Sequence, residues 1–359
     1  MCAVPAHAES FEDIAPYGRS RRTWLGRFLE LPGGIPPRDT ARRVSMLVDP
    51  GEFARGFLAW TRRAFATGDG GDGNDGPSQV AVDGKTLRRS FDRRRGRTPL
   101  HLVSASATGS GLVPARRRVA GKGGEAAVPP DLLAGLDLRG ALAGLDAASC
   151  HPGMAETITS RGADHSVALE GDRRALHAPG SARCGAGPRP APSRSAAGSG
   201  PARTPGTTST AGPSRRRASV ADMAELAGAE EFMAAWPGLR RIVAVEAIRS
   251  AGDPGPNAPQ GVTCQIRRDL TSSDAPEERL AAAVRAHRAI EDCLHWVLDT
   301  GFGEDLSRVR DRNAAADLAV LRRIALDLVR ADTSRPGRLR GKRKTAGRDD
   351  ASMHRLVAP

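Results

Sequence analysis

The sequence predicts an α/β fold built around a mixed β-sheet, and the pattern of residues 77–170 is the evidence for it. Three short apolar runs come first, at 80–84, 100–107 and 111–119, and a turn joins the last two. Helical and strand patterns then alternate, ending in a strand at 165–170. Adjacent strands followed by such an alternation are typical of a sheet with both antiparallel and parallel neighbours.

Residues 1–67 predict a helical N-terminal region. Apolar residues recur at helical spacing in LGRFLEL (25–31), and the stretch at 50–65 starts with proline and repeats apolar residues at the same spacing. The Gly- and Asp-rich residues 68–77 then predict a flexible linker.

The next helices and strands complete the first half of the core. Residues 129–138 begin with prolines and carry spaced leucines, which predicts a helix, and 141–147 is a short strand pattern. Residues 152–162 predict a helix that ends at a glycine. Residues 173–217 are different, because most of them are Pro, Gly, Ser or Ala without periodicity. They predict a disordered insertion.

Order is expected to resume near residue 218. A strand is predicted at 242–248, and apolar residues at helical spacing predict two long helices, over 278–299 and 315–331. The last residues, 335–359, are predicted to form a basic tail.

The net charge favours a polyanionic partner. The chain has 54 Lys and Arg against 41 Asp and Glu, a formal net charge of +13. Basic residues gather in runs at 88–97, 116–118 and 335–348. Such runs neutralise phosphates and bind nucleic acid without reading its sequence. Any single run could equally be a solvated face, but three together favour nucleic acid.

Several other classes of protein lack support. No apolar run is long enough to cross a membrane, and residues 1–16 lack the pattern of a signal peptide. The five cysteines are too scattered for a disulfide framework or a zinc site, so we expect a reduced, cytoplasmic setting. A small-molecule α/β enzyme would be the third class of hypothesis, but the sequence has no GxGxxG, Walker or GxSxG motif.

Three acidic residues are candidates for chemistry. Asp83 and Asp146 each end a predicted strand, and Glu291 lies in the middle of a predicted helix. A carboxylate at the edge of a core is costly unless it is paired or bound to a cation. If the three converged, their oxygens would suit Mg²⁺ or Mn²⁺. Each residue taken alone could instead be a turn residue, a helix cap or an ordinary helix charge.

The segments VAVDGKTLRRSFDR (80–93) and PLHLVSA (99–105) resemble the first catalytic block of the bacterial DDE-type insertion-sequence transposases of the ISAs group, the H-repeat-associated proteins. The N-terminal helices also resemble the family's leader, which here starts late. Further blocks of similarity cover 131–172, 236–246, 280–330 and 337–350.

This resemblance implies a ribonuclease H-like mixed sheet flanked by helices, formed by residues 78–172 and 218–334. It implies that Asp83, Asp146 and Glu291 are the metal-binding triad, with Mg²⁺ or Mn²⁺ as the cofactor. The implied reaction cleaves double-stranded DNA at transposon ends and transfers the strands into target DNA. It also implies a homo-oligomer on DNA, associated with the bacterial nucleoid when bound.

The resemblance also suggests residues that support this chemistry. His287, His295 and Asp299 lie at helical spacings from Glu291 and could orient it, although plain packing explains His295 equally well. Basic residues next to Asp83 and in the C-terminal tail are candidates for contacts with DNA phosphates, namely Lys85, Arg88, Arg89, Arg340, Lys342, Arg343 and Lys344.

Departures from the family pattern keep an alternative open. The third block reads Arg288-Ala289-Ile290-Glu291-Asp292 in place of the usual Trp-Gly-Ile-Glu-Asn, and residues 262–273 lack the strand pattern expected there. The alternative is a catalytically inactive transposase remnant that binds DNA through its basic runs.

Overall fold

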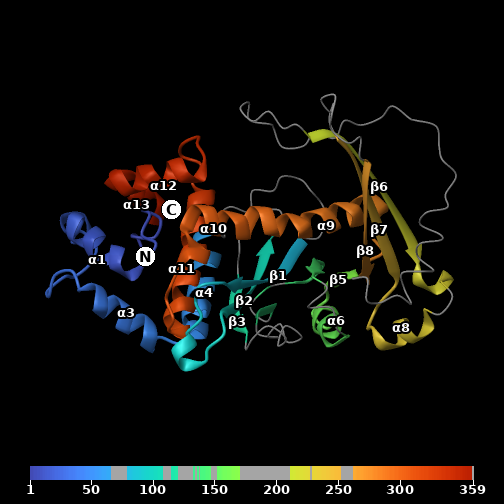
Figure 1. Ribbon diagram of the computed structural model, residues 1–359, viewed down its shortest axis with the longest axis horizontal. Helices are drawn as coiled ribbons and strands as arrows, with labels where there is room; N and C mark the ends of the chain where they lie inside the picture. Colours follow the sequence, from blue (N-terminus) through green and yellow to red (C-terminus); the bar gives the residue numbers. More distant parts are fainter. Residues whose placement is uncertain are drawn as a thin grey trace.

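The centre of the molecule is one eight-stranded sheet in the order β3-β2-β1-β4-β5-β8-β7-β6, with helices packed against it (Figure 1). The mixed α/β fold is therefore confirmed. The computed structural model describes residues 1–65, 79–107, 115–119, 132–133, 136, 138–146, 152–169, 211–226, 229–251 and 262–357. The predicted linker at 68–77 lies outside these residues, as does most of the predicted helix at 129–138.

The first half of the sheet follows the predicted order of strands. It begins with three strands paired antiparallel in succession, β1 (Gln79–Leu87), β2 (Leu100–Ala107) and β3 (Ala115–Val119). The chain then adds β4 (Leu142–Leu145) parallel to β1, the helix α6 (Pro152–Thr159), and β5 (Asp164–Leu169) parallel to β4. A helix between two parallel neighbours is the usual crossover connection.

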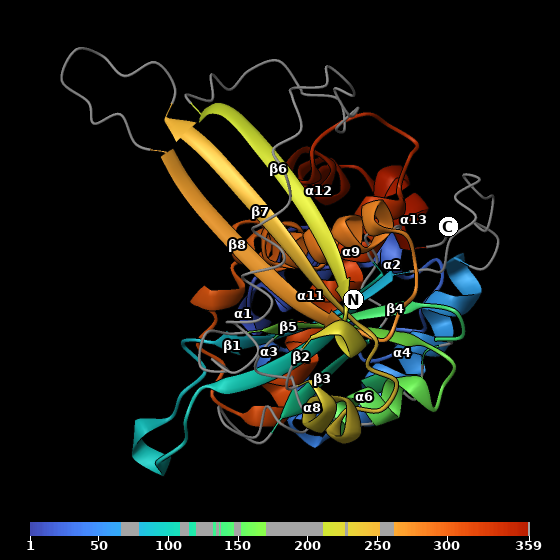
Figure 2. The ribbon, with the colours of Figure 1, turned by 90° about the vertical axis from the view of Figure 1, so that its right-hand side faces the viewer.

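The second half of the sheet is a long antiparallel ribbon of β6 (Ala211–Asp222), β7 (Arg241–Ala251) and β8 (Val262–Thr271). β8 joins the ribbon to β5, and the other end of the ribbon extends away from the body (Figure 2). The short helices η5 (Met223–Glu225) and α8 (Glu230–Ala235) connect β6 to β7.

The ribbon corrects two sequence expectations. The predicted disorder of 173–217 is wrong for 211–217, because these residues pair with β7; residues 170–210 lie outside the described part. The stretch at 262–273, which lacks the expected pattern, nevertheless contains β8. Its charged residues obscure the strand signal, since two of them, Arg267 and Asp269, pair with each other.

One nearly continuous helix crosses a face of the sheet. It consists of α9 (Glu277–Ile290), the π-helical turn η6 (Glu291–His295) and α10 (Trp296–Phe302), and Figure 1 shows it lying along the sheet. Ile290, Leu294 and Leu298 pack around Ala81 of β1. The opposite face of β1 packs its valines against α6. The sheet is therefore covered on both faces.

The two ends of the chain pack together around α11 (Arg312–Ala331), which follows the short helix η7 (Glu304–Leu306). The sequence predicts helix across 25–31, but the helix there covers only Arg22–Leu25 and ends just before Gly26. No helix in the described residues is long and apolar enough to span a membrane. The N-terminal helices are α1 (Phe11–Ser20), α2 (Arg22–Leu25), α3 (Arg38–Leu47) and α4 (Pro50–Phe65).

The predicted basic tail is wrong, because residues 339–357 fold into α12 (Leu339–Arg348) and α13 (Asp350–Val357). Their apolar residues Ala346, Met353 and Leu356 form a core cluster with Trp24 and Val329. The basic residues had masked this amphipathic pattern in the sequence.

Candidate active site

The register of two parallel strands places Asp83 beside Asp146. Val82 of β1 pairs with Leu145 of β4. Asp83 directly follows Val82, and Asp146 directly follows Leu145. Side chains alternate between the two faces of a sheet, so both acids project from the same face. Val82 and Leu145 are fully buried on the face that packs against α6, and the acids therefore project toward the long helix.

Helix α9 runs close over this part of β4. A Cβ atom placed on Gly144 would lie only 3.0 Å from Nδ1 of His287 on α9. His287 is buried, and burial lowers its pKa to about 4, so its ring is neutral near pH 7. Glu291 follows one turn later, at the start of the π-helical turn. Such turns occur frequently at functional sites.

Glu291 borders an open cleft of about 590 Å³ at the end of β1. Gly84 and Arg88 contribute from the strand side, and Trp296 and Asp299 from the helix side. The Trp296 side chain is 63% exposed at this cleft. A large exposed aromatic residue beside a basic one is a combination that suits nucleic acid, because bases stack on aromatic faces.

The three acids are close enough to affect one another electrostatically. The pKa of Asp83 is raised to about 6, mainly because the carboxyl group is buried, and the charges of Asp146 and Glu291 raise it further. A hydrogen bond of 2.7 Å from the Gly84 amide to Asp83 Oδ1 and the positive charge of Arg267 oppose this rise. The structure thus brings the three sequence-predicted acids into one region.

The chemistry of this donor set fits a hard divalent cation. The site offers carboxylate oxygens, and the charges of Asp146 and Glu291, which raise the pKa of Asp83 in addition to its burial, are ones that a bound cation would offset. Within the described residues, no three His, Cys, Asp or Glu side chains lie close enough together to hold a metal ion in this conformation. Any coordination would therefore require these side chains to move toward one another.

The chain matches known proteins over its whole length. It is 30% identical over 359 residues to "Putative transposase YncI" of Escherichia coli O157:H7, covering 87% of that protein. It is 29% identical over 359 residues to "H repeat-associated putative transposase YhhI" of Escherichia coli K12, covering 90% of it. This chain belongs to the H repeat-associated family of insertion-sequence transposases. The family resemblance inferred from the sequence is confirmed.

Two further comparisons concern parts of this family member. Residues 1–61 match the family described as DDE_Tnp_1-associated. Among solved structures, a piggyBac transposase synaptic complex with hairpin DNA is 10% identical, with a TM-score of 0.36, over 79% of this chain and 55% of that one. A score this low supports no inference about the fold.

The helix residues expected to orient Glu291 contact other groups in this H repeat-associated protein. His295 Nδ1 lies 3.5 Å from Asp83 Oδ2, so this histidine faces the first acid. Asp299 forms an ion pair with Lys85. His287 packs against Gly144. Of the three, His295 therefore lies against Asp83, and His287 is near enough to Asp146 for that charge to raise its pKa.

Lys85, for which the sequence predicts a phosphate contact, is largely buried and paired within the protein. Its side chain is only 7% exposed, because Lys85 lies on the face of β1 that the long helix covers. The ammonium group pairs with Asp299 and, at 3.3 Å, with Glu304 Oε2. The buried charge is therefore already neutralised inside the protein.

Arg343, for which the sequence also predicts a phosphate contact, is likewise bonded within the protein. Arg343 is fully buried; it donates to the carbonyl oxygens of Val4, at 2.7 Å, and Gly301, and its guanidinium lies 3.8 Å from the centre of the Phe302 ring. The neighbouring Lys342 donates to the carbonyls of Val329 and Asp332 at the end of α11, where a cation stabilises the helix terminus.

Four of the predicted DNA contacts remain accessible in this family member. Arg340 and Lys344 are exposed on α12, and Arg88 and Arg89 are exposed in the turn after β1. Arg88 pairs with Asp305 Oδ2 at 3.4 Å. These residues remain predicted phosphate contacts.

Sequence reasoning missed Arg267. Its Nε lies 3.2 Å from the buried Asp269 carboxylate, and its charge lowers the pKa values of both Asp83 and His287. Arg267 is thus the cation that faces the acid cluster from β8. Recognising a strand at 262–271 would have revealed it, because residues 267 and 269 share one face of that strand.

Proposed function

We propose that this chain is a DDE-type DNA transposase that cleaves DNA at the ends of an insertion sequence and joins the freed ends to target DNA. Asp83, Asp146 and Glu291 would hold Mg²⁺ or Mn²⁺. The observation that carries the proposal is the pairing of Val82 with Leu145, which sets the two aspartates side by side beneath the helix that carries Glu291.

The fold supports a ribonuclease H-like core. The strands β3-β2-β1-β4-β5 combine an antiparallel trio with two parallel additions. Asp83 lies within β1, directly after the residues that pair with β4, and Asp146 directly follows β4. Active sites commonly lie at the carboxyl ends of parallel strands, where residues from separate segments converge.

The proposed mechanism assigns a separate task to each group. A divalent cation, when bound, would activate the attacking oxygen and stabilise the leaving oxygen of the phosphodiester. The strand ladder holds the backbones of Asp83 and Asp146 side by side, from which their carboxylates would turn toward the cation. His295 restrains Asp83, and Arg267 limits the repulsion among the acids. Trp296 provides an exposed ring on which a base can stack.

The proposal includes double-stranded DNA as the partner, as transposon end and as target, and therefore association with the nucleoid when the protein is bound. It also includes a homo-oligomer, because two transposon ends must be held together for both to be joined to one target. The net charge of +13 supports a polyanionic partner.

A second candidate is an inactive remnant that only binds DNA. It is favoured by the finding that, in the described residues, the acids do not form a group that could hold a metal ion as they stand. The two candidates differ in whether substitution of the three acids changes DNA cleavage by the protein.

The test is cleavage of a plasmid that carries the element's terminal repeats, with Mg²⁺ or Mn²⁺. We expect nicking at the repeat ends by the wild type and its loss in D83N, D146N and E291Q. The matched control is E278Q, an exposed glutamate on the same long helix. A thermal melt provides a second readout, in which millimolar Mg²⁺ should stabilise the wild type but not D83N.

Nicking that persists in all three variants would reject the assignment of the triad. A wild type that binds the plasmid but neither nicks it nor responds to Mg²⁺ in the melt would support the inactive remnant.

A further inference from the structure

Two segments far apart in the sequence bring arginines together near the acid cleft, the cleft that Glu291, Arg88, Trp296, Asp299 and Asp305 line. Arg89 and Phe91, from the turn after β1, line a hollow of about 200 Å³ with Arg308 and Arg310, from the segment before α11. We call these four residues the arginine hollow. Among the residues that the structure describes, no acidic side chain lines this hollow.

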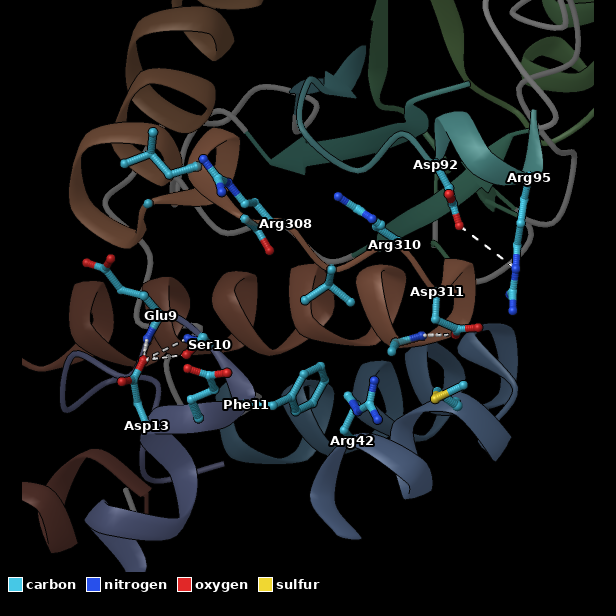
Figure 3. A pocket seen from close by; sticks show the side chains of 17 residues that line it. Glu9, Ser10, Phe11, Asp13, Arg42, Asp92, Arg95, Arg308, Arg310 and Asp311 are labelled. Atoms are coloured by element: carbon cyan, nitrogen blue, oxygen red, sulfur yellow. Dashed lines mark hydrogen bonds and ion pairs between the residues drawn. The ribbon is translucent and has the colours of Figure 1, made fainter. Parts of the chain in front are cut away.

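The backbone explains why Arg308 and Arg310 project together. Residues 307–310 have no regular secondary structure, and the backbone is extended at Ser307 and at Asp311. In an extended chain, alternate side chains point to opposite sides. Val309 accordingly packs against the core, whereas both arginines are exposed. Figure 3 shows them extending from this segment over α11.

The opposing segment is also held in place. Ser90 Oγ donates to the Leu87 carbonyl at 2.8 Å and accepts from the Leu100 amide at 2.7 Å, which closes the turn at its base. Asp92 forms a bridge with Arg97 and accepts a hydrogen bond from the Arg94 amide. The turn therefore presents Arg89 and Phe91 from a fixed backbone.

The three arginines of the hollow concentrate positive charge, and the acidic residues nearby lie in the larger pocket that Arg308 and Arg310 also line, namely Glu9, Glu12, Asp13, Asp92 and Asp311 (Figure 3). In the part of the chain that the structure describes, Arg89, Arg308 and Arg310 have no ion-pair partner, whereas Arg88 next to them pairs with Asp305. Like charges gathered at one place repel one another unless an anion binds between them. Guanidinium groups bind phosphate well, because their donors match its oxygens.

The hollow and the cleft that Glu291 lines are formed by neighbouring residues of the same two segments. Arg88 and Asp305 line that cleft with Glu291 and Trp296, and each is followed within three residues by an arginine of the hollow, Arg89 or Arg308. A DNA strand whose scissile phosphate lies at the acids would place neighbouring phosphates near this position.

We propose that the arginine hollow binds the DNA backbone next to the cleavage point, an inference that rests on the proposed function. Phe91 would pack against a sugar or base of the same strand. The hollow would fix the position of the strand without reading its sequence.

The test measures DNA binding in EDTA, so that it does not depend on cleavage. Fluorescence anisotropy would follow a labelled duplex with the terminal repeat at several KCl concentrations. For R308Q/R310Q we expect affinity to fall about tenfold or more, and the slope of log K against log salt to become shallower by about 1.8, or 0.9 per phosphate. R89Q, from the other segment, should lower the slope by about 0.9.

The matched control is R19Q/R27Q, which removes the same charge from exposed N-terminal positions. A melt of each variant would establish that it is folded. Unchanged affinity and slope in R308Q/R310Q and R89Q, or an equal loss in the control, would overturn the inference while the acid triad could still be active. A wild type that binds no DNA would overturn both the inference and the proposed function.

Discussion

His165 on β5 is a buried base that makes stability depend on pH. It is fully buried near Trp236, with ring centres 6.4 Å apart, and neither ring nitrogen has a hydrogen-bond partner in the described structure. Burial lowers its pKa from 6.5 to about 4. Since the unfolded chain takes up a proton near pH 6.5 and the folded chain does so only near pH 4, acid favours the unfolded state.

We therefore expect His165→Leu to flatten the loss of stability between pH 6.5 and pH 4. The wild type should lose on the order of 3 kcal/mol of unfolding free energy through this residue as pH falls across that window. Urea unfolding at several pH values measures it. His354→Gln, at an exposed position, is the control and should follow the wild-type curve. Parallel curves for H165L and the wild type would contradict the prediction.

At the scale of whole helices and strands, the Lys85 ion pairs connect β1 to the end of the long helix. Lys85 on the strand pairs with Asp299 of α10 and Glu304 of η7. Lys85→Met should destabilise the fold by about 3–5 kcal/mol, because it leaves the buried Glu304 and the half-buried Asp299 without their cation. The triple variant K85M/D299N/E304Q should recover part of this loss in urea unfolding.

DNA binding distinguishes this structural role from the phosphate contact that the sequence suggested. At a temperature where K85M is folded, its affinity for DNA and its salt slope should equal those of the wild type. A slope shallower by about 0.9 would instead identify Lys85 as a phosphate contact.

The sequence predicts most helices and strands because hydrophobic periodicity is a local signal. The strands at β1, β2, β4 and β5 and the helices α9 and α11 all lie where apolar spacing predicts them. The strand β8 and the helix α12 do not show the expected apolar pattern, because charged residues occupy many of their positions, including buried ones. In α12 the partners of the charges come from distant segments, such as Val4 and Gly301 for Arg343, whereas in β8 Arg267 pairs with Asp269 of the same strand.

The same distinction applies to the candidate site. The identities of Asp83, Asp146 and Glu291 follow from the family resemblance, and strand order explains why the first two meet. The burial of Lys85 and the approach of Arg267 depend on tertiary packing, and no local pattern encodes them.

At the scale of the whole molecule, Arg343 joins the two ends of the chain. It bonds to the carbonyls of Val4 and Gly301 and stacks on Phe302. Arg343→Met should cost about 2–4 kcal/mol, because buried carbonyl groups lose their donor. Limited proteolysis should then cut first near residues 1–10. Arg340→Gln on the same helix is exposed and should behave as the wild type.

If R343M were as stable and as protease-resistant as R340Q, the ends of the chain would be held by their apolar contacts alone. Those contacts include the cluster of Trp24, Met353 and Leu356.

Gly144 of β4 determines how closely helix α9 packs on the sheet. A single methyl group at this position would come within 3.0 Å of His287 and lift α9 by a few tenths of an ångström, carrying Glu291 away from the two aspartates. Overpacking a core usually costs about 1–3 kcal/mol, so Gly144→Ala should lower the melting temperature. Under the proposed function plasmid nicking should fall by more than this loss of stability explains, because misplaced reactive groups slow catalysis. Because glycine has no side chain, α9 can pack directly on β4, and the distance between Glu291 and the two aspartates depends on this close packing.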